Sequence, residues 1–85
     1  MSVPVRDAVT QEISELLLED GLPVPELEDD TVLLDTGLDS LGFAVLVTRL
    51  ELTLGYDPFT LMTDAVYPRT LAEFVSVYER FAPTA

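Results

Sequence analysis

The chain has 85 residues, enough for one domain with a single modest core, and its 48% hydrophobic and 24% charged residues are typical of folded globular proteins. Sixteen acidic residues against four basic ones give a net charge of -12, which disfavours nucleic acids and anionic membranes as partners and favours proteins with basic surfaces. The absence of cysteine and histidine excludes disulfides, side-chain thiol chemistry, a Ser-His triad and the usual zinc sites.

The N-terminal stretch MSVPVRDAVTQE lacks the apolar core of a signal peptide. The longest run of apolar residues and glycine, Leu41 to Val47, is far too short to cross a bilayer. We therefore expect a cytoplasmic protein that does not associate with membranes, and we expect it to be a monomer. It should form one domain over residues 1–85, with its core in residues 4–82 and a frayed tail at 83–85.

A first helix is predicted to follow Pro4, because the first turn of a helix accepts proline. The pattern stops at Gly21, with two acidic residues just before it. The apolar residues that recur at helical spacing and indicate a buried face are Val5, Val9, Ile13, Leu16 and Leu17.

Residues 21–36 carry two prolines and a cluster of four acids, a composition that favours neither a helix nor a strand. Structureless connections of this length are uncommon in compact domains. The apolar residues Val32, Leu33 and Leu34 therefore predict an ordered loop that is pinned to the core.

A second helix is predicted from Asp39, a good N-cap residue, to about Leu54, where Gly55 supplies a C-terminal stop. A short helix should span roughly residues 58–63, and Pro68 prevents it from merging with the last helix.

The last helix begins with a capping box, in which Thr70 is the N-cap and Glu73 lies three residues later. The sum is an all-α fold, a small bundle of three main helices plus one short helix, with a long loop between the first two helices. The side chains that the last helix should bury are Leu71, Phe74, Val75, Tyr78 and Phe81.

Ser40 follows the predicted cap Asp39, and this has an ordinary explanation, since helix starts prefer serine and aspartate. A group attached to its hydroxyl would also lie at the positive end of the helix dipole, beside free backbone N–H groups, which suits a phosphodiester. The chain has neither histidine nor lysine to activate this hydroxyl as a nucleophile. We therefore predict that Ser40 is an acceptor that another enzyme modifies.

The segment DTGLDSLGFAVLVTRLE resembles the attachment motif of acyl and peptidyl carrier proteins, in which the serine of a D-S-L triplet carries a phosphopantetheine arm. The predicted elements match the arrangement of that family over residues 4–82. The resemblance implies that the cofactor is 4'-phosphopantetheine, covalently attached to Ser40. It also implies that Asp39 and Leu41 flank the site and contact the modifying enzyme, and that Gly37 provides the loop geometry leading into it.

By the same resemblance, a phosphopantetheinyl transferase modifies the serine using coenzyme A, and the thiol of the arm then holds an acyl or aminoacyl group as a thioester. The protein would be a carrier and not an enzyme, with no catalytic residues and no metal. Its further partners would be an adenylate-forming acyl or aminoacyl ligase and a downstream transferase or synthase.

A helical wheel places one stripe of the second helix toward the core: Phe43, Leu46, Val47, Leu50 and Leu54. The opposite stripe should be partly exposed and form a docking surface for partner enzymes: Leu41, Val45, Thr48 and Leu52. The loop or the short helix could instead cover part of it, Leu52 more than Val45. Gly42 either lets a partner or the arm approach the backbone closely or is a neutral choice.

Carriers of fatty acid synthesis have a strongly acidic second helix, whereas this one has Glu51 as its single acid after Asp39 and carries the basic Arg49. The segment YDPFTLMTDAVYPRTLAEFV resembles stand-alone or nonribosomal-peptide-type carriers instead. We therefore expect a stand-alone carrier of a specialised pathway, polyketide, nonribosomal-peptide-like or modified acyl, with acyl and aminoacyl cargo both open.

Three other functions are compatible with parts of the sequence. An acidic helical interaction domain with an unmodified serine would explain the charge and the exposed stripe. An enzyme based on paired carboxylates is disfavoured, because so small a bundle encloses little volume. A calcium site lacks the ligand spacing, glycine and final glutamate of an EF-hand. Its candidate ligands are Asp29, Asp30, Asp35 and Asp39.

Overall fold

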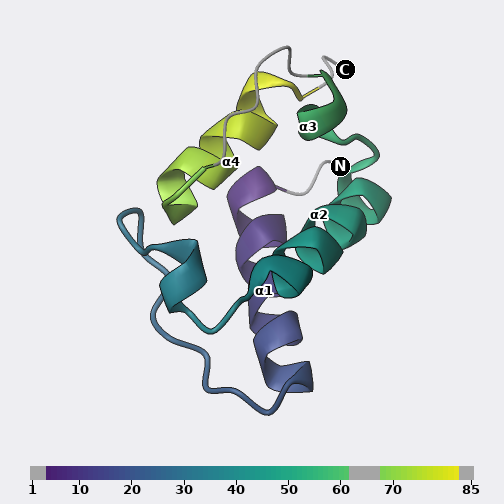
Figure 1. Ribbon diagram of the computed structural model, residues 1–85. Helices are drawn as coiled ribbons and strands as arrows, with labels where there is room; N and C mark the ends of the chain where they lie inside the picture. The colour runs from purple at the N-terminus through teal and green to yellow at the C-terminus, as the bar shows by residue number, and fades with distance from the viewer. Residues whose placement is uncertain (1–3, 62–67, 83–85) are drawn as a thin grey trace.

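Four α-helices and one short 3-10 turn make up the part of the chain that the computed structural model describes, residues 4–61 and 68–82 (Figure 1). The predicted all-α bundle with three main helices and one short helix is confirmed. The end of the short helix beyond Leu61 and the tail at 83–85 lie outside the described residues. The elements in chain order are α1 Val5–Glu19, η1 Leu33–Asp35, α2 Ser40–Leu54, α3 Pro58–Leu61 and α4 Leu71–Arg80.

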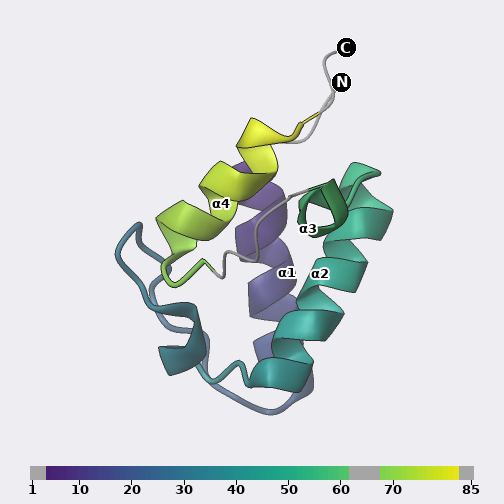
Figure 2. The ribbon, with the colours of Figure 1, turned by 45° about the horizontal axis from the view of Figure 1, so that its top comes forward.

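Helix α1 lies between α2 and α4, and the views of Figures 1 and 2 agree on this arrangement. Its apolar face is buried over its length, and Val9, Ile13 and Leu17 have no solvent exposure. The helix ends in a Schellman motif, in which Gly21 has a φ of 73° and the Leu22 N–H donates to the Leu17 carbonyl at 2.8 Å. The predicted stop at this glycine is confirmed.

Both ends of α2 lie at the capping residues that the sequence predicts. The Oδ1 atom of Asp39 accepts a hydrogen bond from the Gly42 N–H at 2.7 Å, which is N-cap geometry. At the other end Gly55 adopts a φ of 88° and donates its N–H to the Glu51 carbonyl at 2.8 Å. On the core side Leu46 and Leu50 are fully buried. The other three residues predicted for this face are half-buried and pack against the core: Phe43, Val47 and Leu54.

Helix α4 begins at the predicted capping box, with one difference in the return bond. The Thr70 Oγ1 accepts from the Glu73 N–H at 3.2 Å, whereas the Glu73 carboxylate accepts from the N–H of Arg69 and not from that of Thr70. Phe81 is only half-buried, since it is the C-cap residue at the end of the helix. The other four residues predicted to be buried are so: Leu71, Phe74, Val75 and Tyr78.

The loop between α1 and α2 is held against the start of α4 by backbone hydrogen bonds. The Leu33 N–H donates to the Arg69 carbonyl at 3.0 Å, and the Leu71 N–H donates to the Thr31 carbonyl at 2.9 Å. Leu33 is buried, as predicted, but Leu34 is 62% exposed, so the prediction that it anchors the loop is wrong. The reason is the 3-10 turn, in which the side chains of consecutive residues point in different directions. Since Leu33 faces the core, Leu34 faces away from it.

Five aromatic rings from α2, α3, α4 and the α2–α3 connection form a continuous cluster. Ring centroids lie 5.4 Å apart for Phe43 and Phe74, 5.0 Å for Phe74 and Tyr78, and 5.9 Å for Phe59 and Tyr78. Tyr56 joins the cluster through Tyr78, at 5.9 Å. The ring of Phe59 thereby attaches short α3 to α2 and α4.

Candidate functional site

Ser40 is the first residue of α2, and its side chain is exposed. Asp39 holds the start of the helix with two bonds, because its carboxylate caps the Gly42 N–H and its carbonyl accepts from the Phe43 N–H at 2.9 Å. The N–H groups of Ser40 and Leu41 belong to the first turn and have no acceptor within the helix. These two amides and the helix dipole can therefore stabilise a negative charge next to the Ser40 hydroxyl.

Gly37 shapes the chain that leads into this helix. Its φ is +112°, a conformation that side chains rarely adopt. A Cβ atom there would also lie 3.1 Å from Leu22 Cδ1 and 3.3 Å from Leu17 Cδ2. The turn therefore packs directly on the end of α1, at the point where the chain leads into α2.

Gly42 makes room for the start of its own helix. A Cβ atom at this position would lie 3.2 Å from the capping Oδ1 of Asp39 and 3.2 Å from Leu38 Cδ2. Leu38 is a buried core residue that the periodicity of the helices did not identify, since it lies in the connection before α2. Glycine at position 42 thus lets Leu38 and the cap pack closely.

An apolar pocket of about 310 Å³ opens beside Ser40. Its walls come from the 3-10 turn η1 and the first turn of α2, which are near in the sequence, and from the connection before α4, which is distant from both. Sequence reasoning missed it, because only the hydrogen bonds between the loop and the start of α4 bring these segments together. The described residues that line it are Leu33, Leu34, Ser40, Phe43 and Pro68.

The outward stripe of α2 is exposed at three of its four predicted positions. Leu41 is 74% exposed, Leu52 is 82% exposed, and Thr48 is also exposed. Val45 is half-buried and packs against the core. The alternative, in which the loop or the short helix covers Leu52 more than Val45, is therefore wrong, because Val45 packs against the core while Leu52 is exposed to solvent.

The one basic residue of α2 is neutralised by α1. Arg49 donates two hydrogen bonds to the carboxylate of Glu19, which lower the pKa of Glu19 and raise that of Arg49. Since the guanidinium is paired in this way, it adds little positive charge to the outward stripe of the helix.

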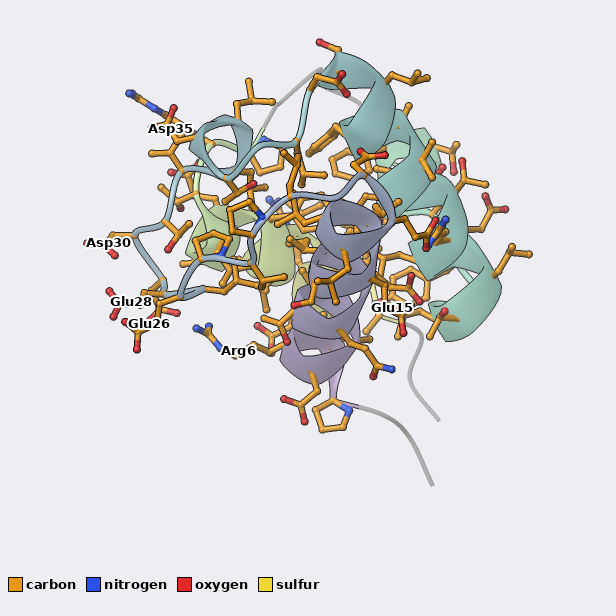
Figure 3. All side chains as sticks on the ribbon, turned by 90° about the horizontal axis from the view of Figure 1, so that it is seen from below. Arg6, Glu15, Glu26, Glu28, Asp30 and Asp35 are labelled. Atoms are coloured by element: carbon orange, nitrogen blue, oxygen red, sulfur yellow. The ribbon has the colours of Figure 1, made fainter. Side chains whose placement is uncertain are left out.

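The acidic loop forms a solvent-facing edge, on which Glu26, Glu28 and Asp30 lie close together while Asp35 lies apart (Figure 3). Asp29 is paired with Arg6 of α1. Over residues 4–61 and 68–82 no group of three or more acidic side chains is placed to hold a metal ion. In the same part of the chain, no helix is both long and apolar enough to cross a membrane.

Comparisons with known proteins agree with this geometry. A family model described as "Phosphopantetheine attachment site" matches residues 7–75. The solution structure of MacpD, an acyl carrier protein from Pseudomonas fluorescens involved in mupirocin biosynthesis, is similar with a TM-score of 0.80 and 31% identity. The similarity covers 95% of this chain and 73% of MacpD. A search of curated proteins found no match.

The family match spans most of the chain and contains the exposed serine, its cap and the loop that leads into it. Carrier domains of this kind are not themselves catalytic; they bind a phosphopantetheine arm covalently and present cargo to other enzymes. The chain therefore belongs to the phosphopantetheine attachment site family and is a carrier protein of the acyl and peptidyl carrier type.

Proposed function

We propose that Ser40 bears the phosphopantetheine arm and that the protein carries an acyl group in a specialised biosynthetic pathway. The observation that carries this proposal is the position of Ser40, an exposed hydroxyl at the first residue of a helix inside the family match. The similarity to MacpD, whose pathway makes mupirocin, favours a specialised pathway and acyl rather than aminoacyl cargo.

The residues around Ser40 fit a phosphodiester-linked arm. The free N–H groups of Ser40 and Leu41 would face the phosphate, and the neighbouring pocket is apolar. When bound, the arm supplies a thiol, which the chain lacks and which can hold cargo as a thioester. The chain has no histidine to remove the proton of Ser40, so a separate transferase has to do so.

Three kinds of partner follow from this role. A phosphopantetheinyl transferase would attach the arm, an adenylate-forming ligase would load it, and a transferase or synthase would remove the cargo. We assign their docking to the exposed stripe of Leu41, Thr48 and Leu52 beside Ser40, with a smaller contribution from half-buried Val45. Because Arg49 is already paired with Glu19, this surface would recognise its partners mainly through apolar contacts.

Intact mass spectrometry tests the proposal. The purified protein is incubated with coenzyme A and a broad-specificity phosphopantetheinyl transferase, alongside Ser40→Ala and Ser76→Ala. Ser76 is an exposed serine on α4 and serves as the matched control. We expect the parent and Ser76→Ala to gain the mass of one phosphopantetheine and Ser40→Ala to gain nothing.

A gain on Ser40→Ala would mean that another residue is the acceptor. If no protein gains mass while an established carrier is modified in parallel, an interaction domain with an unmodified serine becomes the better explanation. Loading of the modified protein with a panel of acyl and amino acids by adenylate-forming ligases then separates the two kinds of cargo.

A further inference from the structure

The one basic residue of the helix that begins with Ser40 is held by a residue of another helix. Arg49 of α2 donates two hydrogen bonds to the carboxylate of Glu19, the last residue of α1. We propose that Glu19 is a specificity-determining residue: it keeps positive charge off the outward stripe of α2, so that enzymes with a basic surface can dock there and reach Ser40. The proposal rests on the proposed function and adds to it a residue outside α2 and the kind of partner surface that fits.

Arg49 is a direct neighbour of the outward stripe. It lies four residues after Val45 and three before Leu52, and side chains at these spacings lie next to each other on a helix surface. An arginine that is free to move would extend its long side chain over this surface. The guanidinium of Arg49 instead turns toward α1, where its two donors lie 2.6 and 2.7 Å from the carboxylate oxygens of Glu19.

The charge of the whole chain indicates which partner surfaces benefit from this arrangement. A net charge of -12 attracts enzymes with basic surfaces and speeds their encounter with the carrier. Arg49 opposes this attraction at the docking stripe, and within α2 only Glu51 offsets it. A free guanidinium beside Leu52 would repel a basic side chain of the partner, and such repulsion lowers the affinity for that partner. Glu19 supplies the compensating negative charge from α1.

The fold depends little on this pair. Both side chains contact solvent, with 31% of Arg49 and 55% of Glu19 exposed, and ion pairs in such positions add little to stability. The buried residues Leu46 and Leu50 already hold α2 in the core. Loss of the pair should therefore leave Ser40 at the start of the helix and change mainly the charge on its outer surface.

Glu15 provides a matched control on the same helix. It is an exposed acid one turn before Glu19, labelled in Figure 3, and its carboxylate accepts a hydrogen bond from the side chain of Gln11 at 3.3 Å. The two acids carry the same charge, but Glu19 is the one that orients the guanidinium of Arg49 through two hydrogen bonds. A comparison between them separates the pairing of Arg49 from the net charge of the chain.

Steady-state kinetics of phosphopantetheinyl transfer test the proposal. The transferase of the mass assay is used with the parent, Glu19→Gln, Arg49→Gln, their double variant and Glu15→Gln, after circular dichroism has shown that all five are folded. At low salt we expect Glu19→Gln to raise the KM for the carrier about 2- to 5-fold more than Glu15→Gln does, with kcat unchanged. Arg49→Gln should have a KM no higher than that of the parent, and adding it to Glu19→Gln should restore the parent's KM. High salt should remove these differences.

Three results would overturn the proposal while the attachment to Ser40 stands. Equal effects of Glu19→Gln and Glu15→Gln would show that only the net charge matters. A loss in Arg49→Gln as large as that in Glu19→Gln, with no recovery in the double variant, would show that the pair acts by holding α1 and α2 together. A KM of the parent that does not change with salt would show that no basic surface faces α2. If the parent gains no phosphopantetheine at all, both the attachment and the role of Glu19 in docking are wrong.

Discussion

Arg49 forms a bidentate ion pair with Glu19, in which Nη1 donates to Oε2 at 2.6 Å and Nη2 donates to Oε1 at 2.7 Å. The pair joins the middle of α2 to the C-terminal end of α1 across 30 positions of sequence. Its two-point geometry fixes the relative position of the helices more narrowly than a single contact would. The helix that begins with Ser40 is thereby tied to α1 some nine residues after the serine.

The first prediction concerns the pH dependence of this pair. Hydrogen bonds from Arg49 lower the pKa of Glu19 below its usual value of 4.5. The unfolded protein therefore binds this proton more readily than the folded one, so the pair stabilises the fold above pH 4.5, and this stabilisation is lost as pH falls through the lower folded pKa. The effect is small, since both groups contact solvent.

Melting temperatures from pH 3 to 7 check this for the parent and for Glu19→Gln, with Glu28→Gln as a control. Glu28 lies on the acidic loop (Figure 3), whereas the carboxylate that Arg49 contacts is that of Glu19. The deficit of Glu19→Gln should be largest at neutral pH, should shrink at high salt and should vanish in acid. A deficit that persists unchanged at pH 3 would contradict a role of the charge.

The second prediction concerns the cap before Ser40. Replacing Asp39 by alanine removes the acceptor of the Gly42 N–H and should lower the free energy of unfolding by about 0.5–2 kcal/mol. Asp39→Asn keeps an acceptor oxygen and should retain most of the stability. Urea denaturation measures both, and equal losses in the two variants would show that the charge of Asp39, and not its capping bond, matters.

The third prediction concerns two costs of replacing a glycine by alanine: the strain of a positive φ and the overlap of the new Cβ atom with its neighbours. Gly21 and Gly37 both have positive φ, but a Cβ atom at Gly21 meets nothing within 4 Å, whereas one at Gly37 meets Leu17 and Leu22. Gly21→Ala should cost about 1 kcal/mol, the usual cost of this conformation for alanine. Gly37→Ala should cost more, up to about 3 kcal/mol, because strain and overlap add.

Chemical denaturation of both variants measures the difference. Similar losses at the two positions would mean that Leu17 and Leu22 move aside, in which case the contact of the turn with α1 does not constrain the approach to Ser40.

The fourth prediction concerns the tyrosine pair of the aromatic cluster. Tyr78 is fully buried, and its hydroxyl has no hydrogen-bond partner among the described residues, so Tyr78→Phe should be neutral or stabilising. The Tyr56 hydroxyl donates to the Tyr78 carbonyl at 2.6 Å, so Tyr56→Phe should cost about 0.5–1.5 kcal/mol. A large loss for Tyr78→Phe would indicate a hydrogen bond that the described residues do not provide.

Burial also raises the pKa of Tyr78 above its usual value of 10.0. The folded state therefore keeps the neutral phenol where the unfolded chain ionises, and stability should fall as pH rises above 10.0. Tyr78→Phe should resist this loss, and melting temperatures from pH 8 to 11 in the two proteins provide the measurement.

Local chemistry was sufficient to predict the helix ends and to place Ser40 at the start of α2. Asp39, Thr70 and Gly55 form their bonds with residues three or four positions away, so the sequence around each of them already contains the whole interaction. The buried faces of α1 and α4 likewise follow from helical spacing, because the period of the helix determines which side chains share a side. The candidate attachment site at Ser40 belongs to this class.

Contacts between distant segments were decided by the tertiary structure alone. Leu34 turned outward and Leu38 inward because of the turn and the connection in which they lie, and neither position has a helical period to predict it. The pocket beside Ser40 depends on hydrogen bonds that bring the loop to the start of α4, some 40 positions later in the chain. The sequence by itself therefore determined where a carrier's serine stands, whereas packing across the bundle determined which side chains surround it.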